Sequence, residues 1–275
     1  MDLSKELVEH IIMSIMGFFI FLLYILIIFL LLSSSRLREM KSNQLLLNLS
    51  IGHMITGVSH FAGMWTLFRV GKFVFVGGMY ANISLIVLTI DRCIYILKPL
   101  HYKLMHPGWH ILFMTISPLF ALTLFGLYVH TGLNNPVHLD EISTLPFIFF
   151  LSVMTVLLFI PSFVVFRIVR RQRSRIASCN IGIPKGQAPR EKSRNEERRS
   201  FYVCFGCVTT FALLWLPAIV LRIWEIASGL KMKYTYLAIS AIFATFNSFS
   251  DAVICVWFNK ELKKRLRTVL RNPCR

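Results

Sequence analysis

Long apolar stretches separated by short polar segments dominate this chain and leave few folds open to it. Hydrophobic residues make up 56% of its 275 residues and charged residues only 16%, which is more apolar surface than one soluble domain of this length needs. Each stretch reaches the roughly 20 residues that a helix needs to cross a bilayer core about 30 Å thick. We expect seven spanning segments, at about 8–32, 44–68, 73–97, 108–129, 145–169, 200–224 and 234–258.

The bilayer decides the secondary structure of these segments. Because hydrocarbon offers no hydrogen-bond partner to the backbone, a spanning segment must satisfy its own N–H and C=O groups as a helix. We therefore predict an all-α membrane protein, a seven-transmembrane helix bundle that forms one domain over residues 1–275. A short amphipathic cytoplasmic helix is predicted at about 259–270, where Leu262 and Leu266 alternate with cations as in helices that lie on a membrane surface.

The basic residues predict the orientation of the bundle. The net charge is +17, and 24 of the 30 Lys and Arg residues fall on one predicted side of the membrane. This side is expected to be cytosolic, which places the N-terminus outside the plasma membrane and the C-terminus in the cytoplasm. The polar, basic segment 170–199 is predicted to be an inner loop. The orientation of the bundle thus accounts for the positive charge. A second role of this charge would be to bind the headgroups of anionic lipids. Nucleic acid is not an expected partner.

The cysteines indicate neither a metal site nor a disulfide framework. All six fall in predicted helices or on the predicted cytosolic side, where thiols stay reduced. Cys204 and Cys207 have the spacing of a metal or redox pair, but no second Cys or His pair follows at ligand spacing. We interpret both as small buried hydrophobes. We predict no metal and no cofactor. Because no paired carboxylates or nucleophile–base arrangement gather at one depth, we also predict no enzyme activity.

Two short motifs mark candidate functional positions. The third stretch ends in Asp91-Arg92, and ionised residues at the mouth of a helical bundle are costly unless they have a partner and a function. The sixth stretch contains Phe211 and, four residues later on the same helix face, Trp215. Pro217 removes a backbone hydrogen bond just beyond the Trp and should kink the helix there. Packing alone would also explain the two aromatic residues, but their combination with the proline predicts a pivot.

With these motifs the chain resembles the rhodopsin-like family of G-protein-coupled receptors. Phe-x-x-x-Trp-x-Pro in a sixth span resembles the family's activation switch, and Pro161 lies where the family's fifth helix is usually kinked. The resemblance implies a receptor that senses a small extracellular ligand and activates a heterotrimeric G protein through outward movement of the sixth helix. Further matches are Asn43, Leu47 to Ser50, Trp109 with Pro118, Pro99 to Tyr102, and Phe258 to Glu261.

Glu197 is a candidate partner for Arg92. It lies 20 residues before Pro217, or about 30 Å along a helix that rises 1.5 Å per residue, which brings it level with Arg92. We hypothesise an Arg92–Glu197 ionic lock that joins the third and sixth helices in the resting state and opens for a G protein. An exposed pair contributes only about 0–1 kcal/mol, so it would bias the switch. Alternatively, Glu197 is one of many solvated loop charges.

Several departures from the family pattern support a second interpretation. The family's Asn-Pro-x-x-Tyr near the end of the seventh helix is replaced by Asp251 to Cys255, and the acidic residue of its second helix by His53. Val169 stands where the fifth helix usually has Tyr, and no cysteine for the family's outer disulfide precedes the third helix. These changes favour a non-coupling receptor-like protein that acts as a decoy or partner subunit.

Two of the departures are predicted to compensate each other. His53 lies ten residues inward of Asn43 and Asp251 eight residues inward of Asn259, which gives similar depths of about 15 and 12 Å. An unpaired carboxylate at that depth is expensive, and a histidine can be its partner. We predict a buried His53–Asp251 pair in place of the sodium-binding pocket typical of the family. The alternative is an independent histidine that faces a polar cavity.

The candidate ligand end is apolar. Val74 stands 18 residues before Arg92. Receptors for biogenic amines resemble one another in having Asp at this position, so a biogenic amine is disfavoured as the ligand. Arg222, two turns outward of Trp215, could meet a carboxylate, phosphate or amide carbonyl, or extend to the outer interface. The other lining is apolar and fits a lipid-like ligand. The candidate ligand-binding residues are Val74, Gly78, Val153, Trp215, Arg222, Leu237 and Ala241.

Within the family, the missing outer disulfide and the apolar lining resemble the group of cannabinoid, lysophospholipid, adenosine and melanocortin receptors. The spans from Leu49 to Gly57 and from Phe211 to Lys260 resemble weakly the lipid-amide-sensing glucose-dependent insulinotropic receptor.

A light-driven pump or a transporter is a third functional class for a seven-helix bundle. A retinal Schiff base needs a lysine in the seventh helix, and 234–258 contains none; the repeated halves of transporters are not found either.

Overall fold

The computed structural model describes residues 3–63, 71–98, 102, 104, 107–134, 153–168, 170–171, 188–228 and 234–271. Within these ranges the chain is helical, and no β-strand is present. A further helix, Val153–Ile168, lies between α6 and α8 in the chain. The labelled helices are α1 (Leu3–Leu32), α2 (Ser35–Glu39), α3 (Lys41–Gly63), α4 (Gly71–Leu97), α6 (Pro107–Asn134), α8 (Ala188–Ser228), α9 (Tyr234–Phe258) and α10 (Lys260–Arg271).

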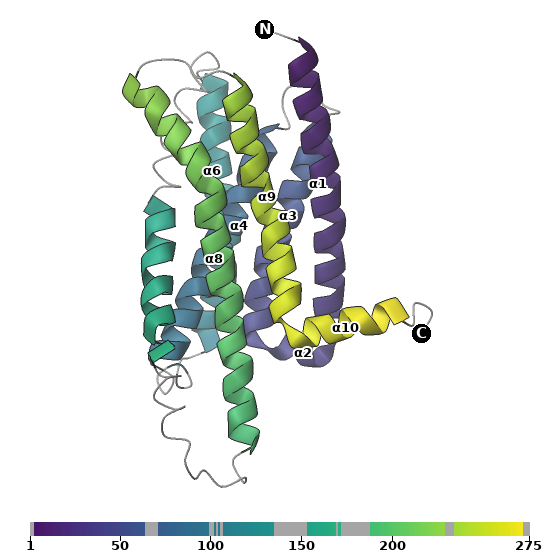
Figure 1. The fold of residues 1–275 in the computed structure, drawn as a ribbon, viewed down its shortest axis with the longest axis vertical. Coiled ribbons are helices and arrows are strands. Elements are labelled where there is room, and N and C mark those ends of the chain that lie inside the picture. Colours follow the sequence, from purple (N-terminus) through teal and green to yellow (C-terminus); the bar gives the residue numbers. More distant parts are fainter. Residues whose placement is uncertain are drawn as a thin grey trace.

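The long helices run side by side as a bundle (Figure 1). Four stretches of the described chain are long and apolar enough to cross a membrane: His10–Leu32, Lys41–Ala62, Val76–Leu97 and Tyr202–Ser228. Three shorter apolar helical stretches are Gly108–Thr123, Val153–Ile168 and Ile242–Phe258. Each of them overlaps one of the predicted spans. The fold is therefore an all-α membrane bundle, while the number of spans and the single domain over 1–275 stay predictions.

The outward faces of the helices are apolar, as a bilayer requires. Phe19 and Phe29 of α1, Ile111 of α6, Leu213 of α8 and Val253 of α9 are all more than half exposed. In water such faces would form an aggregation-prone patch, but in hydrocarbon they are matched to their solvent.

Small residues let α3 approach α4 closely. A Cβ atom added at Gly52 would lie 2.6 Å from the backbone N of Ala81, and one added at Gly77 would lie 2.5 Å from the backbone N of Thr56. Without a hydrophobic force between helices in lipid, such close backbone packing is what holds spans together. The α3–α4 pair is accordingly one of the most extensive contacts in the bundle, along with α1–α3 and α8–α9.

The helix α8 begins earlier than predicted. It starts at Ala188, so residues 188–199 of the expected loop 170–199 are helical. Two sequence features account for the difference. Pro189 lies in the first turn, where its missing N–H costs nothing, and residues 190–199 are mostly Arg, Glu and Lys, which are good helix formers. At its other end α8 runs through Pro217 without a break and changes direction toward its C-terminus (Figure 1).

The amphipathic helix α10 lies across one end of the bundle (Figure 1). Leu262 is fully buried against the core, whereas Lys264 and Arg267 are exposed. Asn259 caps the helix, because its side-chain oxygen accepts a hydrogen bond of 3.2 Å from the backbone N of Leu262. The same amide donates to Oδ1 of Asn43 at 3.2 Å, which fixes α10 against the start of α3.

Candidate functional site

A cluster of polar side chains lies in the centre of the bundle. Nε2 of His53, on α3, is 3.1 Å from Oδ2 of Asp251, on α9, and the two side chains are 4% and 1% exposed. The structure thus brings together the two residues that the sequence predicts as a buried pair. A carboxylate buried this deeply needs a partner, because its desolvation is compensated only by close, well-directed contacts.

Three more residues hold the Asp251 carboxylate and the His53 ring in place. Asn247 donates to Oδ2 of Asp251 at 3.3 Å, and Thr210 of α8 donates to Oδ1 at 3.4 Å. On the other side of the ring, Nδ1 of His53 lies 2.9 Å from Oγ of Ser248. Both ring nitrogens therefore have partners, and the Asp251 carboxylate has three donors around it.

Tyr24 of α1 closes the cluster. Its ring stacks on His53 with centroids 4.9 Å apart, and its hydroxyl donates to the backbone carbonyl of Ser248 at 2.8 Å. Side chains from α1, α3, α8 and α9 therefore meet in one network, which we call the central polar cluster (Tyr24, His53, Thr210, Asn247, Ser248 and Asp251).

The predicted pivot residues lie next to this cluster along α8. Phe211 is fully buried, and its ring centroid is 6.0 Å from that of Trp215, which packs against the same core. Thr210, the partner of Asp251, directly precedes Phe211. Any movement of α8 at the aromatic pair therefore acts on the hydrogen bond to Asp251. Pro217 follows within the same helix, and Pro161 lies on the Val153–Ile168 helix.

A second buried carboxylate lies at the C-terminal end of α4. An Nη atom of Arg92 is 2.6 Å from Oδ2 of Asp91, and both residues are almost fully buried. The hydroxyl of Tyr102 donates to Oδ1 of Asp91 at 2.9 Å. Burial, together with the negative charge of Asp91, raises the pKa of the Tyr102 phenol above its ordinary value, so the phenol stays protonated and keeps donating.

Arg92 keeps unused hydrogen-bonding capacity. Its Nε atom is buried and has no partner among the residues that the structure describes. An arginine carries five N–H donors, so the contact with Asp91 leaves the guanidinium free to meet another acceptor. The side chain of its predicted partner Glu197 lies outside the described part, although the Glu197 backbone belongs to α8. The ionic lock therefore stays a prediction.

The predicted ligand-binding residues are only partly described. The side chains of Val74, Arg222, Leu237 and Ala241 lie outside what the structure describes. A Cβ atom at Gly78 would meet no atom of the described residues within 4 Å, so this position faces open space among them. Val153 is 36% exposed at the start of its helix. Trp215 lies within the bundle beside Phe211.

Sequence reasoning did not assign roles to Tyr24, Tyr102 or the residues before Asp251. A tyrosine in the middle of an apolar stretch is a usable signal, because a buried phenol almost always finds a partner. Asn247 and Ser248 were also detectable in principle: they precede Asp251 by four and three residues and so share its helix face. The Tyr102–Asp91 contact has no such signal, since Tyr102 lies beyond the end of α4.

The chain is similar to vertebrate opsins. It is 26% identical over 266 residues to a blue-sensitive opsin of Gekko gecko, with 84% of this chain and 72% of that protein covered. It is 24% identical over 224 residues to a green-sensitive opsin of Gallus gallus, of whose length it spans 60%. No family model matches the chain. Opsins are rhodopsin-like G-protein-coupled receptors, so the similarity supports a multi-pass membrane receptor with a signalling, non-enzymatic role. It does not bear on the narrower resemblance to lipid-amide receptors.

Proposed function

We propose that this protein is a rhodopsin-like receptor of the plasma membrane, which binds a small extracellular ligand and activates a heterotrimeric G protein. The observation that carries the proposal is the Arg92 guanidinium, buried at the end of α4 and held by the Asp91 carboxylate that Tyr102 also binds. A buried, permanently charged group at the end of a membrane helix is costly unless it serves a function. The similarity to an opsin over most of the chain also supports the proposal.

The proposed switch is a shift between two bundle states. In the resting state Arg92 is held by Asp91 and, in our hypothesis, by Glu197 of α8. Outward movement of the Glu197 end of α8 would release Arg92 and open a cleft for the G protein. A ligand that binds the open state more tightly shifts the population toward it.

The central polar cluster is the proposed link between the two ends of the receptor. Phe211 and Trp215 pack against each other on α8, and Thr210, which directly precedes Phe211, binds Asp251. At 3.4 Å this hydrogen bond is the longest around the carboxylate. It is therefore the contact that a rotation of α8 would break first, whereas the shorter contact between Asp251 and His53 would keep α9 attached to α3.

The proposed ligand is small and lipid-like. Of the candidate lining, Gly78 faces open space, and Trp215 provides an aromatic wall. Val74, Val153, Leu237 and Ala241 would add apolar surface, and Arg222 a cation for a polar head such as an amide or phosphate. The colour sensitivity named for the two opsins is not carried over, because 234–258 contains no lysine for a retinal Schiff base.

The proposed orientation has the N-terminus outside the cell and the C-terminus in the cytoplasm. Most Lys and Arg residues then face the cytosol, as the positive-inside rule requires. In this orientation α10 lies on the inner leaflet, with Leu262 toward the bundle and Lys264 and Arg267 toward lipid headgroups or water.

A non-coupling receptor that acts as a decoy or partner subunit is the second candidate function. The observation that favours it is the replacement of the seventh-helix motif by Asp251 to Cys255, where Asp251 is bound by His53 and Cys255 is buried. A cluster that ties α9 to α3 this closely could hold the bundle in one state.

A G-protein activation assay in cells separates the two candidates. Wild type, Arg92→Ala and the control Arg271→Ala, which removes an exposed cation of α10, are compared at matched surface expression, alone and with a panel of lipid amides and lysophospholipids. We expect wild type and Arg271→Ala to activate at least one G protein and Arg92→Ala to lose at least tenfold, equal to about 1.4 kcal/mol. Wild type that reaches the surface and activates none would sink the receptor proposal and favour the decoy.

A further inference from the structure

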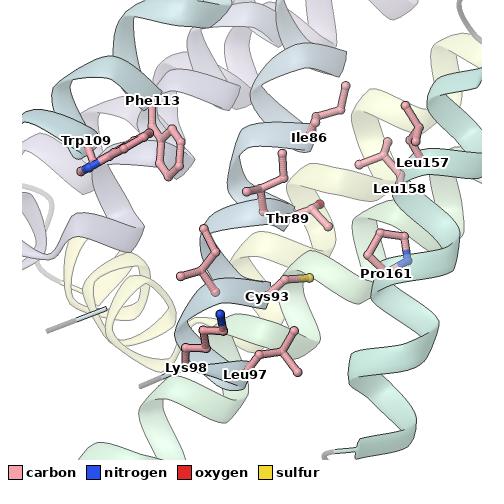
Figure 2. Close-up of a pocket in the computed structure, with 12 residues that line it drawn as sticks. Ile86, Thr89, Cys93, Leu97, Lys98, Trp109, Phe113, Leu157, Leu158 and Pro161 are labelled. Atoms are coloured by element: carbon pink, nitrogen blue, oxygen red, sulfur yellow. The ribbon is translucent and has the colours of Figure 1, made fainter. Parts of the chain in front are cut away.

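A groove among the described helices is lined by none of the predicted ligand-binding residues. It runs between α4, α6 and the Val153–Ile168 helix and encloses about 810 Å³, within the range of small-molecule sites. Figure 2 shows Ile86 near one end and Leu97 and Lys98 at the other, with Leu157 and Pro161 along one wall. The groove thus follows α4 from Ile86 to Leu97, roughly its last three turns at 3.6 residues per turn.

The lining makes hydrocarbon the only suitable occupant of most of this space. Ile90 and Leu97 of α4, Trp109 of α6 and Leu157 line the groove and are 45–57% exposed. In a membrane bundle, such exposed apolar side chains face acyl chains. Water there would have few polar partners, and ordered water needs two to four of them. A flexible chain of methylene groups fits an elongated apolar groove of this kind.

One end of the groove carries a cation. Lys98 directly follows α4, its side chain is exposed, and no carboxylate of the described residues forms an ion pair with it. It lies six residues beyond Arg92, or about 9 Å further along the helix direction. A lysine at the end of a span reaches the level of the lipid headgroups. Trp109, two residues into α6, is of a type enriched at the same level.

We propose that this groove binds one anionic phospholipid, with an acyl chain along α4 between α6 and the Val153–Ile168 helix and the headgroup phosphate on Lys98. The proposal assigns the lipid to the cytosolic leaflet, and in this respect it rests on the orientation proposed above. A zwitterionic lipid would fill the same apolar space. Its headgroup, however, carries a cation of its own, which Lys98 repels, so the charge of Lys98 selects for the anionic lipid.

The occupant would lie close to the proposed switch. Thr89 lines the groove, and its hydroxyl is 3.2 Å from Sγ of Cys204 on α8. Cys93, which directly follows Arg92, also lines it. Only one layer of side chains therefore separates the lipid from α8 and from the Arg92 end of α4.

The test uses the full chain in nanodiscs that contain a trace of phosphatidylglycerol or phosphatidylcholine with a photoreactive group in the acyl chain. After irradiation, labelled peptides are quantified by mass spectrometry. We expect phosphatidylglycerol to label the peptides around 86–98, 109–113 and 157–161 on the order of fivefold more than phosphatidylcholine does, since one lysine near the surface attracts anionic lipid by about that factor.

Two variants and two matched controls decide the proposal. Lys98→Gln should lower phosphatidylglycerol labelling to the phosphatidylcholine level, whereas Lys260→Gln, which removes an exposed lysine of α10, should not. Ile90→Trp, which fills the groove, should lower labelling by both lipids, whereas Val253→Trp on the exposed face of α9 should not. Equal labelling by both lipids, or no change with Lys98→Gln, overturns the headgroup assignment; labelling spread evenly over all outward faces overturns the site.

This experiment needs neither a ligand nor a G protein. If the protein is labelled as expected but activates no G protein, the lipid site is supported and the proposed function is overturned. If it activates a G protein but is labelled evenly, only the lipid site is overturned.

Discussion

Asp251 and Asp91, the two buried carboxylates among the described residues, are bound in different ways. Asp251, in the centre, is bound by His53 from a helix almost 200 residues away in sequence and by Thr210 from a third helix. Asp91, at the end of α4, is bound by its neighbour Arg92 and by Tyr102, eleven residues on. The first arrangement joins helices that are distant in sequence. The second is local, so α8 can move without breaking it.

This difference assigns the two regions different tasks. Because the central polar cluster draws on four helices, its loss should affect the stability of the whole bundle. The Asp91–Arg92–Tyr102 group holds a permanent charge in position, so its loss should affect coupling more than folding. Each of the following variants tests one side of this comparison.

The largest effect is expected for His53→Ala. It leaves the Asp251 carboxylate buried without the His53 ring that lies 3.1 Å away, and breaking a buried pair in this way costs about 3–5 kcal/mol. Thermal unfolding of the purified protein in one detergent measures the change. The double variant His53→Leu with Asp251→Leu removes both partners and should recover most of the stability. A cost below about 1 kcal/mol for His53→Ala would mean that the pair is not the main support of the centre.

A smaller effect is expected where α3 meets α4. Gly77→Ala puts a methyl group 2.5 Å from the backbone of Thr56, and such overpacking costs about 1–3 kcal/mol. Gly78→Ala is the matched control one residue along the same helix, since its methyl group would meet nothing within 4 Å. It should stabilise by up to about 1 kcal/mol through helix propensity. Equal unfolding temperatures of the two variants would contradict the close α3–α4 contact.

Tyr102→Phe should cost less than either. It removes one hydrogen bond to a charged group, worth about 1.5–3 kcal/mol when fully buried and less at this half-buried position. The folded-state pKa of the phenol is raised above its ordinary value of 10.0. The contribution is therefore complete below that pH and is lost only as the pH rises through the folded-state pKa. The phenolate absorbance difference between wild type and Tyr102→Phe should be absent at pH 10; half-complete ionisation there would refute the buried hydrogen bond.

The smallest effect on stability is expected for Thr210→Val, which removes the 3.4 Å hydrogen bond to Asp251. The cost should be at most about 1 kcal/mol, but it should shift basal G-protein activation upward, by up to about fivefold if the bond exists only in the resting state. Thr209→Val is the control, because the Thr209 hydroxyl donates to the backbone carbonyl of Phe205 in its own helix and, among the described residues, to no carboxylate. Identical basal activation by both variants would remove the cluster from the proposed switch.

The helices of this fold and the pairing of His53 with Asp251 could be predicted from sequence. Apolar runs of sufficient length can only be helices in lipid, and the rise per residue of a helix converts sequence position into depth. That conversion works for Asp251 because both of its reference points, Asn43 and Asn259, lie in contact at 3.2 Å. The N-terminal turns of α8 were missed because polar residues with a proline also match a loop.

Direction around a helix is harder to predict than depth. Glu197 and Arg92 have similar expected depths, but whether they face each other stays a prediction, because the Glu197 side chain lies outside the described part of the chain. The contact between Tyr102 and Asp91 depends on the path of the chain after α4, and residue spacing alone does not predict that path. The groove along α4 was also not predicted, because it depends on how far α6 and the Val153–Ile168 helix diverge from α4.

The central claim is that Arg92 is needed for G-protein activation. It is tested most directly by measuring nucleotide exchange on purified heterotrimers, with the receptor reconstituted in nanodiscs. The account predicts that wild type accelerates exchange and that Arg92→Ala, assayed as folded receptor at matched concentration, loses at least tenfold of this acceleration. Exchange that is the same for wild type and Arg92→Ala, with both proteins folded, would contradict it.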